Sequence, residues 1–380
     1  MRWIYLDYNA TTPLAPAAQE AMLPYLADRY ADPRAEHAPG RIVAEAIDDA
    51  RTRVATALGA FADEVAWTSS GTESCSRALR ETIEPALRAG STPHLVVSAI
   101  DHAAVLGTAR FLQTLGAGLT VVRVDAEGRV DPSDVMAALR PETRLVSIGL
   151  ANEEIGTVQP LAAIAELCHD EGVLVHTDAT QAFGKLPIDV RSLGVDLLSV
   201  SAHKAYGPKG VGVLYARRGA PVEPCLLAGF EAADEPAGMP NIAGIVGFGA
   251  AAPVAADAAQ HSRQQLAALR DRLAKLLLSG AGGGQVYGQI EGPRLVNTLC
   301  IALPGVTASD LLSATPEIAA TPCATGGPET VVLSPTLQAI NADPRVASGA
   351  IRLSLGWQTT ADEVERAAAA LLDAWERCRD

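Results

Sequence analysis

The chain has 380 residues, of which 48% are hydrophobic, and it carries a formal net charge of −14 at pH 7. A chain of this length and hydrophobicity can bury more than one core, so it predicts two domains and excludes general disorder. The acidic charge argues against a general binder of nucleic acid or membrane surfaces, because both present phosphates that a negative protein repels.

The N-terminal stretch MRWIYLDYNATT turns polar within six residues, and no apolar run approaches the length of a membrane span. The cysteines are far apart in the sequence and include no CxxC pair, a spacing that fits neither a disulfide framework nor a zinc knot. We therefore expect no secretion signal, no membrane contact, no metal, and free thiols in a reducing cytoplasm. The cysteines are Cys75, Cys168, Cys225, Cys300, Cys323 and Cys378.

Alanine-rich helical stretches alternate with strand-like apolar runs through the first two thirds of the chain. Helices are expected at residues 15–30, 40–59, 102–116, 131–140 and 161–172. Strands are expected at residues 94–100, 119–124, 143–150, 172–179, 196–202 and 210–216. This alternation predicts an α/β fold with a mostly parallel sheet, in which ligands bind at the carboxyl ends of the strands.

After residue 249 the pattern changes. One long amphipathic helix is expected over residues 251–278, followed by strands at 295–303 and 350–356 and a closing helix at 360–378. Thr360 is a plausible N-cap of that last helix, with Glu363 three residues on. We place a large cofactor-binding domain at residues 15–255 and a smaller α+β domain at 1–14 and 256–380.

Three polar stretches are expected to meet at the strand ends. HTDATQA (176–182) and SAHK (201–204) end two apolar strands, which would bring Asp178 and Lys204 to one site. TSSGTES (68–74) is a strand-to-helix turn whose glycine and hydroxyls could hold a phosphate at a helix N-terminus. These parts match pyridoxal phosphate (PLP), which needs a lysine amine, a carboxylate for its pyridine nitrogen and a phosphate cradle.

Each of these stretches also has an ordinary structural interpretation. A His-Lys pair before a turn is most often a solvated loop pair, Asp178 alone could cap a helix, and TSSGTES alone could be a capped turn. Their order and their positions at strand ends within one α/β layer make joint coincidence much less probable.

The order of several longer motifs resembles a known family. LDYNATTP, SSGTES, DHAAV, NEEIGTVQPL, HTDATQAFGKLPIDV, SAHKAYGPKGVGVLY, GIVGFG and IRLSLGWQTT follow one another as in cysteine desulfurases of the NifS and IscS kind. These are class-V aminotransferase-like enzymes of PLP fold type I, the aspartate-aminotransferase-like fold. The resemblance implies a large domain with a mostly parallel seven-stranded sheet, a smaller C-terminal domain, a homodimer and PLP as cofactor.

The resemblance also implies roles for single residues. Lys204 would bind the cofactor covalently, Asp178 would pair with its pyridine nitrogen, and His102 would stack on its ring and act as a base candidate. Gln181 would bond the phenolic oxygen, while the phosphate would be held by Gly71, Thr72, Ser201 and His203. Arg352 would clamp the substrate carboxylate, although it could instead form a surface ion pair, and Asn152 and Glu153 would contact the substrate.

A desulfurase needs a thiolate that accepts sulfur as a persulfide, and Cys323 lies in a glycine-containing loop, CATGGPETVVLSP, 29 residues before Arg352. By resemblance it is the reactive cysteine, on a long loop of the kind that carries sulfur to an acceptor protein. We expect its thiol to be exposed and readily deprotonated. Cys75, Cys168 and Cys300 are expected to pack as small hydrophobes.

Three departures from the family pattern bear on substrate choice. Glu153 stands where the family has the second of two asparagines, Ser76 stands where an asparagine commonly follows TES, and Met239 stands where a threonine would reach the partner's phosphate. The region before Gly244 also lacks the family's arginine and carries Glu231, Asp234 and Glu235. A carboxylate at position 153 would repel a substrate carboxylate unless it is protonated or turned away.

The leading hypothesis is a homodimeric PLP-dependent desulfurase that converts L-cysteine to L-alanine, parks sulfur on Cys323 and delivers it to an acceptor protein. The alternative is a related PLP-dependent lyase for selenocysteine or another cysteine-like amino acid, which would not need Cys323. A third hypothesis, a scaffold that kept the fold and lost the chemistry, is opposed by the intact Lys204 and Asp178.

Overall fold

The computed structural model describes residues 3–225, 238–326 and 330–379. Its larger part contains a seven-stranded sheet in the order β2-β8-β7-β6-β5-β3-β4, in which β2–β8 and β7–β8 are antiparallel and the other pairs parallel. The strands are β2 (Val65–Thr68), β3 (His94–Ser98), β4 (Gly118–Val122), β5 (Thr143–Ser147), β6 (Leu174–Asp178), β7 (Leu197–Ser201) and β8 (Gly212–Ala216). The mostly parallel seven-stranded sheet is thereby confirmed.

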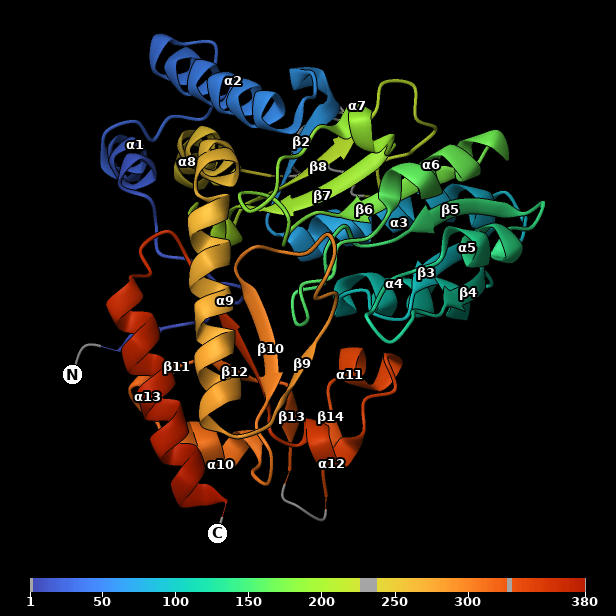
Figure 1. Cartoon of the computed structure of the whole chain (residues 1–380). Helices are drawn as coiled ribbons and strands as arrows, with labels where there is room; N and C mark the ends of the chain where they lie inside the picture. The colour runs from blue at the N-terminus through green and yellow to red at the C-terminus, as the bar shows by residue number, and fades with distance from the viewer. Residues whose placement is uncertain (1–2, 226–237, 327–329, 380) are drawn as a thin grey trace.

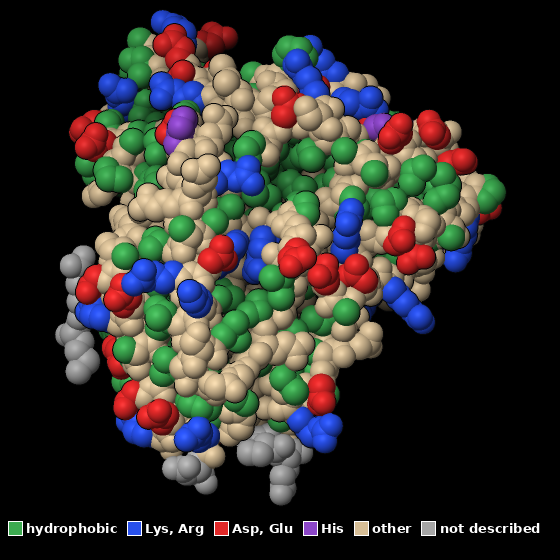
Figure 2. Space-filling model, viewed as in Figure 1, with side chains coloured by type: hydrophobic (Ala, Val, Ile, Leu, Met, Phe, Trp, Pro, Cys, Tyr) green, Lys and Arg blue, Asp and Glu red, His purple; other side chains and the backbone are tan. Residues whose placement is uncertain are grey.

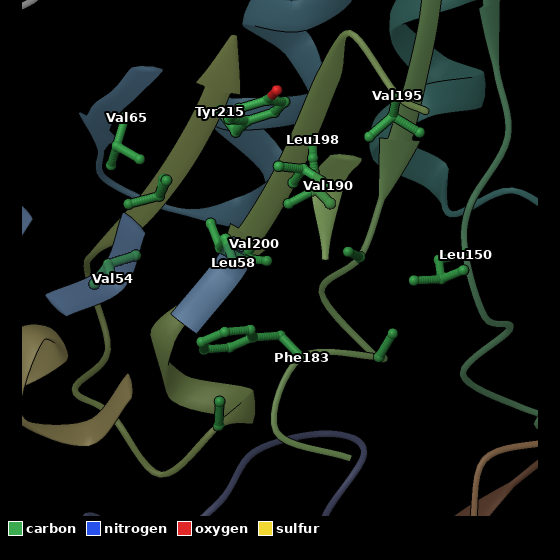
Figure 3. Packing of buried hydrophobic residues seen from close by; sticks show 14 of the residues in the cluster. Val54, Leu58, Val65, Leu150, Phe183, Val190, Val195, Leu198, Val200 and Tyr215 are labelled. Carbon is green, nitrogen blue, oxygen red and sulfur yellow. The ribbon is translucent and has the colours of Figure 1, made fainter. Parts of the chain in front are cut away.

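Helices cover this sheet (Figure 1). They are α1 (Pro16–Ala27), α2 (Ala38–Leu58), α3 (Gly71–Arg88), α4 (Ala103–Thr114), α5 (Pro132–Ala138), α6 (Leu161–Asp170), α7 (Val190–Leu193) and α8 (Ile242–His261), with the 3₁₀ turns η1 (Ala62–Glu64) and η2 (Ala202–Lys204). Figure 3 shows side chains of β7 and β8 packing with Leu58 of α2 and with Phe183. Leu58, Leu198 and Phe183 are at most 1% exposed, and each such burial stabilises the fold by about 1.5–3 kcal/mol.

The smaller part surrounds a second apolar core. Its main sheet has the order β12-β15-β10-β9. The elements are α9 (Arg263–Gly280), β9 (Gln285–Tyr287), β10 (Thr298–Ala302), α10 (Ala308–Ser313), β11 (Ile318–Ala319), β12 (Thr321–Pro322), β13 (Ala324–Thr325), β14 (Val332–Leu333), α11 (Pro335–Ala339), α12 (Pro344–Ala347), β15 (Ala350–Ser354) and α13 (Ala361–Cys378). The predicted Thr360–Glu363 capping box is confirmed at the start of α13.

The N-terminal strand β1 (Ile4–Tyr5) belongs to this second core, because it pairs in parallel with β11 and its Ile4 is buried there. That pairing supports the proposed assignment of residues 1–14 to the small domain. The division at residue 255 stays a prediction.

The single long helix expected over residues 251–278 is wrong. The chain forms two helices, α8 and α9, which meet at Ser262. They pack against different neighbours, α8 against α1 and α2 and α9 against α13, and they run in different directions in Figure 1. The helical spacing of apolar residues continues through Ser262. The sequence pattern therefore could not show that residues before and after Ser262 pack into two different cores.

Among the described residues, α8 is the one helix that is long and apolar enough to cross a membrane, and 61% of its apolar window is buried inside the fold. A core helix of this kind passes the same test of length and composition.

On the face shown in Figure 2, Lys and Arg side chains are interspersed with Asp and Glu side chains and do not form one basic patch.

Candidate active site

A cavity of about 300 Å³ opens where the carboxyl ends of β5, β6 and β7 meet the N-termini of α3 and α4. This is the position at which open α/β sheets bind ligands. Its lining contains most of the residues singled out from the sequence: Gly71, Thr72, His102, Asn152, Glu153, Asp178, Gln181, Ser201, His203 and Lys204. Arg352 and Cys323 are not part of this lining.

Lys204 and Asp178 reach the cavity from neighbouring strands. Asp178 is the last residue of β6 and lies opposite Ser199 of β7, while Lys204 ends the 3₁₀ turn that follows β7. Because β6 and β7 run parallel, the Lys204 amine and the Asp178 carboxylate lie at the same end of the sheet, where the strands have their carboxyl ends. This is the arrangement that the two stretches HTDATQA and SAHK predicted.

The turn before α3 forms an anion cradle. Ser70 caps the helix by accepting a hydrogen bond from the Glu73 amide, and Gly71 and Thr72 in the first turn line the cavity. A Cβ atom on Gly71 would lie 2.9 Å from Thr180 Oγ1 and 3.2 Å from the Ser201 Cβ. Glycine is thus required for this close approach, and the exposed helix N-terminus favours a negatively charged group.

The polar groups around this cradle are suited to a phosphate. Thr180 Oγ1 is buried and has no hydrogen-bond partner among the described residues, which leaves a hydroxyl free to donate. His203 contacts Thr11 through Nδ1 at 3.1 Å, and burial together with Lys204 lowers its pKa to about 4. A neutral His203 with Nδ1 accepting would carry its proton on Nε2, so it can donate to an anion without adding charge.

The carboxylates at the sheet edge lie in a neutral, buried surrounding. His176 is held between Ser147 and Ser199, at 2.7 and 3.0 Å, and burial lowers its pKa to about 4. Asp101 accepts hydrogen bonds from the Ser98 and Gly149 amides, yet burial raises its pKa to about 7. The neutral imidazole of His176 therefore leaves Asp178 without a cationic partner on its own strand, and a protonated pyridine nitrogen would supply one.

His102 stands at the mouth of the cavity as the N-cap of α4. Its Nδ1 atom accepts a hydrogen bond from the Ala104 amide at 3.1 Å. In the neutral ring the proton is then on Nε2, which makes this nitrogen a donor. This tautomer favours proton donation over the predicted role as a base, while stacking on the cofactor ring stays a prediction.

Gln181 is fixed by two residues, one of which the sequence reasoning missed. Lys185 Nζ donates to Gln181 Oε1 at 2.7 Å, and Gln181 Nε2 donates to the Asn9 carbonyl at 3.0 Å. One Nε2 hydrogen remains for a ligand oxygen. Lys185 is 7% exposed, and burial, with Lys204 and Arg352 nearby, moves its pKa well below the ordinary value. The GK pair in HTDATQAFGKLPIDV was the only available signal.

Asn152 does not have the free hydrogen-bonding capacity that a substrate contact needs. Its amide donates to the Ile100 carbonyl and to Thr336 Oγ1, and its oxygen accepts from the amides of Glu154 and Ile155. Both hydrogens and both lone pairs are thus used within the protein. Asn152 shapes the turn that carries Glu153 into the cavity lining.

Arg352 lies in β15 and forms an ion pair with Asp7, with 2.7 Å between Nη2 and Oδ1, and it also contacts Thr321. Its Nε atom is buried and has no hydrogen-bond partner among the residues that the structure describes. The ion-pair alternative is therefore present in this structure, but the pair is buried and not on the surface, and Nε keeps an unused donor.

The expectation of an exposed, readily deprotonated Cys323 is wrong for this structure. Cys323 is 3% exposed, and burial together with the contact to Cys300 raises the pKa of its thiol well above the ordinary value. The backbone explains the burial: the Cys323 amide donates to the Ala350 carbonyl, and its own carbonyl accepts from the Ser334 amide. Cys75, Cys168 and Cys300 are fully buried, which confirms their packing role.

The departures from the family pattern in the region before Gly244 fall on or beside residues that the structure does not describe. Glu231, Asp234 and Glu235 lie outside the described residues, whereas Met239 is 58% exposed. Ser76 lies in α3, one helical position after the buried Cys75. Neither Met239 nor Ser76 lines the cavity.

The cavity and its fold define a class of protein. The Aminotransferase class-V family matches residues 4–367, and the chain belongs to this family. The residues present fit PLP: Gly71 allows a close approach at the α3 N-terminus, the buried Thr180 hydroxyl has no partner among the described residues, and Asp178 and Lys204 line the same cavity.

Within that family the chain is of the NifS and IscS type of cysteine desulfurase. It is 37% identical to "Cysteine desulfurase IscS" of Dictyoglomus turgidum, over 96% of this chain and 92% of the relative. A solved "NifS-like protein" superimposes with a TM-score of 0.91 at 31% identity, covering 99% of this chain and 100% of the other. A structure titled "SspA in complex with cysteine" has a TM-score of 0.78 at 30% identity, covering 92% and 98%.

Proposed function

We propose that this protein is a PLP-dependent cysteine desulfurase that converts L-cysteine to L-alanine and transfers the sulfur to Cys323 as a persulfide. The observation that carries the proposal is the meeting of Lys204, Asp178 and the α3 N-terminus in one cavity. The similarity to SspA, which was solved in complex with cysteine, supports L-cysteine as the substrate.

When bound, PLP supplies an electron sink for the carbon atoms of the amino acid. Lys204 would hold the cofactor and, once its amine is released by the substrate, move protons at the substrate carbon. Asp178 would keep the pyridine nitrogen protonated, and the Nε2 donor of His102 would cover the opposite face. The remaining hydrogen on Gln181 Nε2 would fix the phenolic oxygen.

Sulfur transfer requires a movement of Cys323. The thiol is outside the cavity lining and is held by backbone hydrogen bonds to Ala350 and Ser334. We propose that the segment after β12 leaves these bonds so that the thiol reaches the substrate sulfur. The thiolate would then attack that sulfur, and the bond between the sulfur and the substrate carbon would break in favour of a new sulfur–sulfur bond. The released carbon is protonated and leaves as alanine.

Arg352 would bind the substrate carboxylate once Asp7 gives up part of the ion pair. The unpartnered Nε atom supports this role, because a bidentate contact uses Nε together with an Nη atom. Glu153 lines the cavity, so we expect its carboxylate to turn away from the substrate carboxylate on binding.

A related PLP-dependent lyase for selenocysteine or another cysteine-like amino acid is the second candidate. The observation in its favour is the position of Cys323, which is buried away from the cavity. Such a lyase would use Lys204 and Asp178 and release its product without a protein thiol.

Release of alanine from L-cysteine in the presence of a thiol reductant tests these two functions. The desulfurase predicts turnover by the parent holoenzyme, loss of turnover in Lys204→Ala, and loss in Cys323→Ser with the cofactor retained. Cys378→Ser is the matched control, because that thiol lies in the last turn of α13, away from the cavity. Full alanine production by Cys323→Ser would favour the lyase.

We also propose a cytoplasmic homodimer that passes sulfur to an acceptor protein. The free thiols suit a reducing compartment.

For the dimer, α1 and the residues after it expose large apolar side chains, Leu23, Leu26 and Tyr30, at 56%, 65% and 80%. Exposed groups of this kind are typical of protein interfaces.

A further inference from the structure

Three side chains with metal-binding chemistry meet outside the cavity. The carboxylate of Glu154 and the Sγ atoms of Cys300 and Cys323 all lie within 4.8 Å of one another. They come from three separate places: the turn between the bridged residues Ala151 and Val158, strand β10, and the end of β12. The sequence spacing of the cysteines gives no sign of this cluster, which is made by the small-domain sheet and one turn of the large domain.

The distance between the two sulfurs indicates which chemistry the cluster suits. Cys300 and Cys323 have their Sγ atoms 3.6 Å apart. Two thiolates on a tetrahedral zinc ion, each about 2.3 Å from the metal, are about 3.8 Å apart. A disulfide needs about 2.05 Å and a two-electron oxidant. The thiols therefore already have the spacing of a metal-bound pair, whereas a disulfide requires them to approach by more than an ångström.

The surroundings partly compensate the charges of such a site. Two thiolates and a carboxylate carry three negative charges, of which a divalent cation balances two, and the nearby Arg352 guanidinium is already ion-paired with Asp7. Arg352 acts electrostatically on both Cys323 and Glu154. Ser334 Oγ donates a hydrogen bond to the Glu154 carboxylate.

One polar group beside the cluster is unused. Tyr287 lies opposite Cys300 in the β9–β10 pairing and is 3% exposed, and its hydroxyl has no hydrogen-bond partner among the described residues. Cys300 and Cys323 both act electrostatically on this hydroxyl. A buried hydroxyl without a partner is costly, and a water on the open position of a three-ligand metal would provide one.

We propose that Glu154, Cys300 and Cys323 form a binding site for a thiophilic divalent cation, with zinc as the representative ion. Binding replaces the two thiol protons with two sulfur–zinc bonds and releases two protons, with no change of oxidation state. Its consequence for activity rests on the proposed function: a zinc-bound Cys323 cannot accept sulfur, so the cation holds the acceptor thiol in its buried position.

Zinc titration of the holoenzyme without substrate, in competition with a colorimetric chelator, tests the site directly. We expect one tight equivalent in the parent and at least tenfold weaker binding in Cys300→Ala and Glu154→Gln. Cys168→Ala removes a fully buried thiol from another core and serves as the matched control. Cys300→Ser, with retained PLP absorbance and far-ultraviolet circular dichroism, separates loss of a ligand from loss of the fold.

Cobalt(II) substitution gives an independent readout. The parent should show thiolate-to-cobalt charge transfer and the intense visible bands of a tetrahedral site, and Cys300→Ala should lose both. An unchanged zinc affinity in Cys300→Ala, or a cobalt spectrum without thiolate bands, would overturn the proposal.

The effect on turnover separates this inference from the proposed function. In the parent, chelator-buffered zinc should suppress alanine formation at least tenfold, and the ratio of activity with and without zinc should approach one in Cys300→Ala. A parent that makes no alanine before zinc is added contradicts the desulfurase and leaves the titration result standing. A parent that binds zinc through other residues contradicts the site alone.

Discussion

At the scale of single residues, burial controls protonation throughout the candidate site. His176 and His203 are driven neutral, whereas Asp101 and Glu154 have their pKa values raised to about 7. The same burial that positions these groups therefore sets which of them carry charge near neutral pH. A negatively charged chain can in this way keep an anion-binding cavity free of avoidable negative charge.

Glu154 should make the protein less stable as the pH rises. Its pKa in the folded state, about 7, lies above the ordinary value of 4.5, so the folded state binds the proton more tightly than the unfolded state. The contribution is fully present below pH 4.5 and is lost as the pH rises through about 7, amounting to roughly 3 kcal/mol at most.

Urea unfolding of the parent and of Glu154→Gln between pH 4.5 and 7.5 measures this. The variant should lose part of the decline in unfolding free energy, while Glu376→Gln, at an exposed position of α13, should follow the parent. Identical pH dependence in the parent and Glu154→Gln would show that the carboxyl titrates as an exposed group.

At the scale of elements, the start of α3 has the geometry of an anion-binding site. The helix begins directly after the edge strand β2, and its first turn enters the cavity without a side chain at Gly71. The sequence predicted this turn from its glycine and hydroxyls together with its position beside the other strand ends, since TSSGTES alone could be an ordinary capped turn.

Gly71→Ala should weaken PLP binding by about tenfold or more, because the added Cβ would lie 2.9 Å from the Thr180 hydroxyl. Gly107→Ala, within α4 and with no atom closer than 4 Å to the new methyl group, is the control and should gain about 0.5–1 kcal/mol of stability. Titration of each apoprotein with PLP, followed by absorbance, measures both affinities. Equal affinities would show that the phosphate does not sit at α3.

The fold and the cavity were predictable where polar residues follow strands that the local sequence pattern already indicates. Strand ends placed Lys204 and Asp178 together, because the register of parallel strands follows from alternation with helices. The break at Ser262 and the burial of Cys323 were not predictable, because each depends on contacts between segments far apart in the sequence. For the same reason the Cys300–Cys323 pair had no visible signal, and Lys185 had only the GK pair.

At the scale of the whole molecule, the residues proposed for the chemistry come from both hydrophobic cores. The large sheet holds the cofactor cavity, whereas Cys323 and Arg352 belong to the small-domain sheet. Chemistry at the cavity therefore depends on residues that lie outside its lining in this structure.

The parent should be a dimer in solution, and Leu26→Asp should shift it towards monomer at low micromolar concentration, because a charge at a buried interface position is costly. Leu115→Asp, at a residue 51% exposed after α4, is the control and should leave the mass unchanged. Light scattering coupled to gel filtration gives the masses. A monomeric parent would contradict the dimer.

The measurement that tests the central claim most directly is the mass of the holoenzyme after one equivalent of L-cysteine without reductant. A desulfurase predicts one alanine per active site and a gain of one sulfur atom on the peptide that contains Cys323, removable by a thiol reductant and absent in Cys323→Ser. Alanine formation with no sulfur on the protein, or with the sulfur on another cysteine, would contradict it.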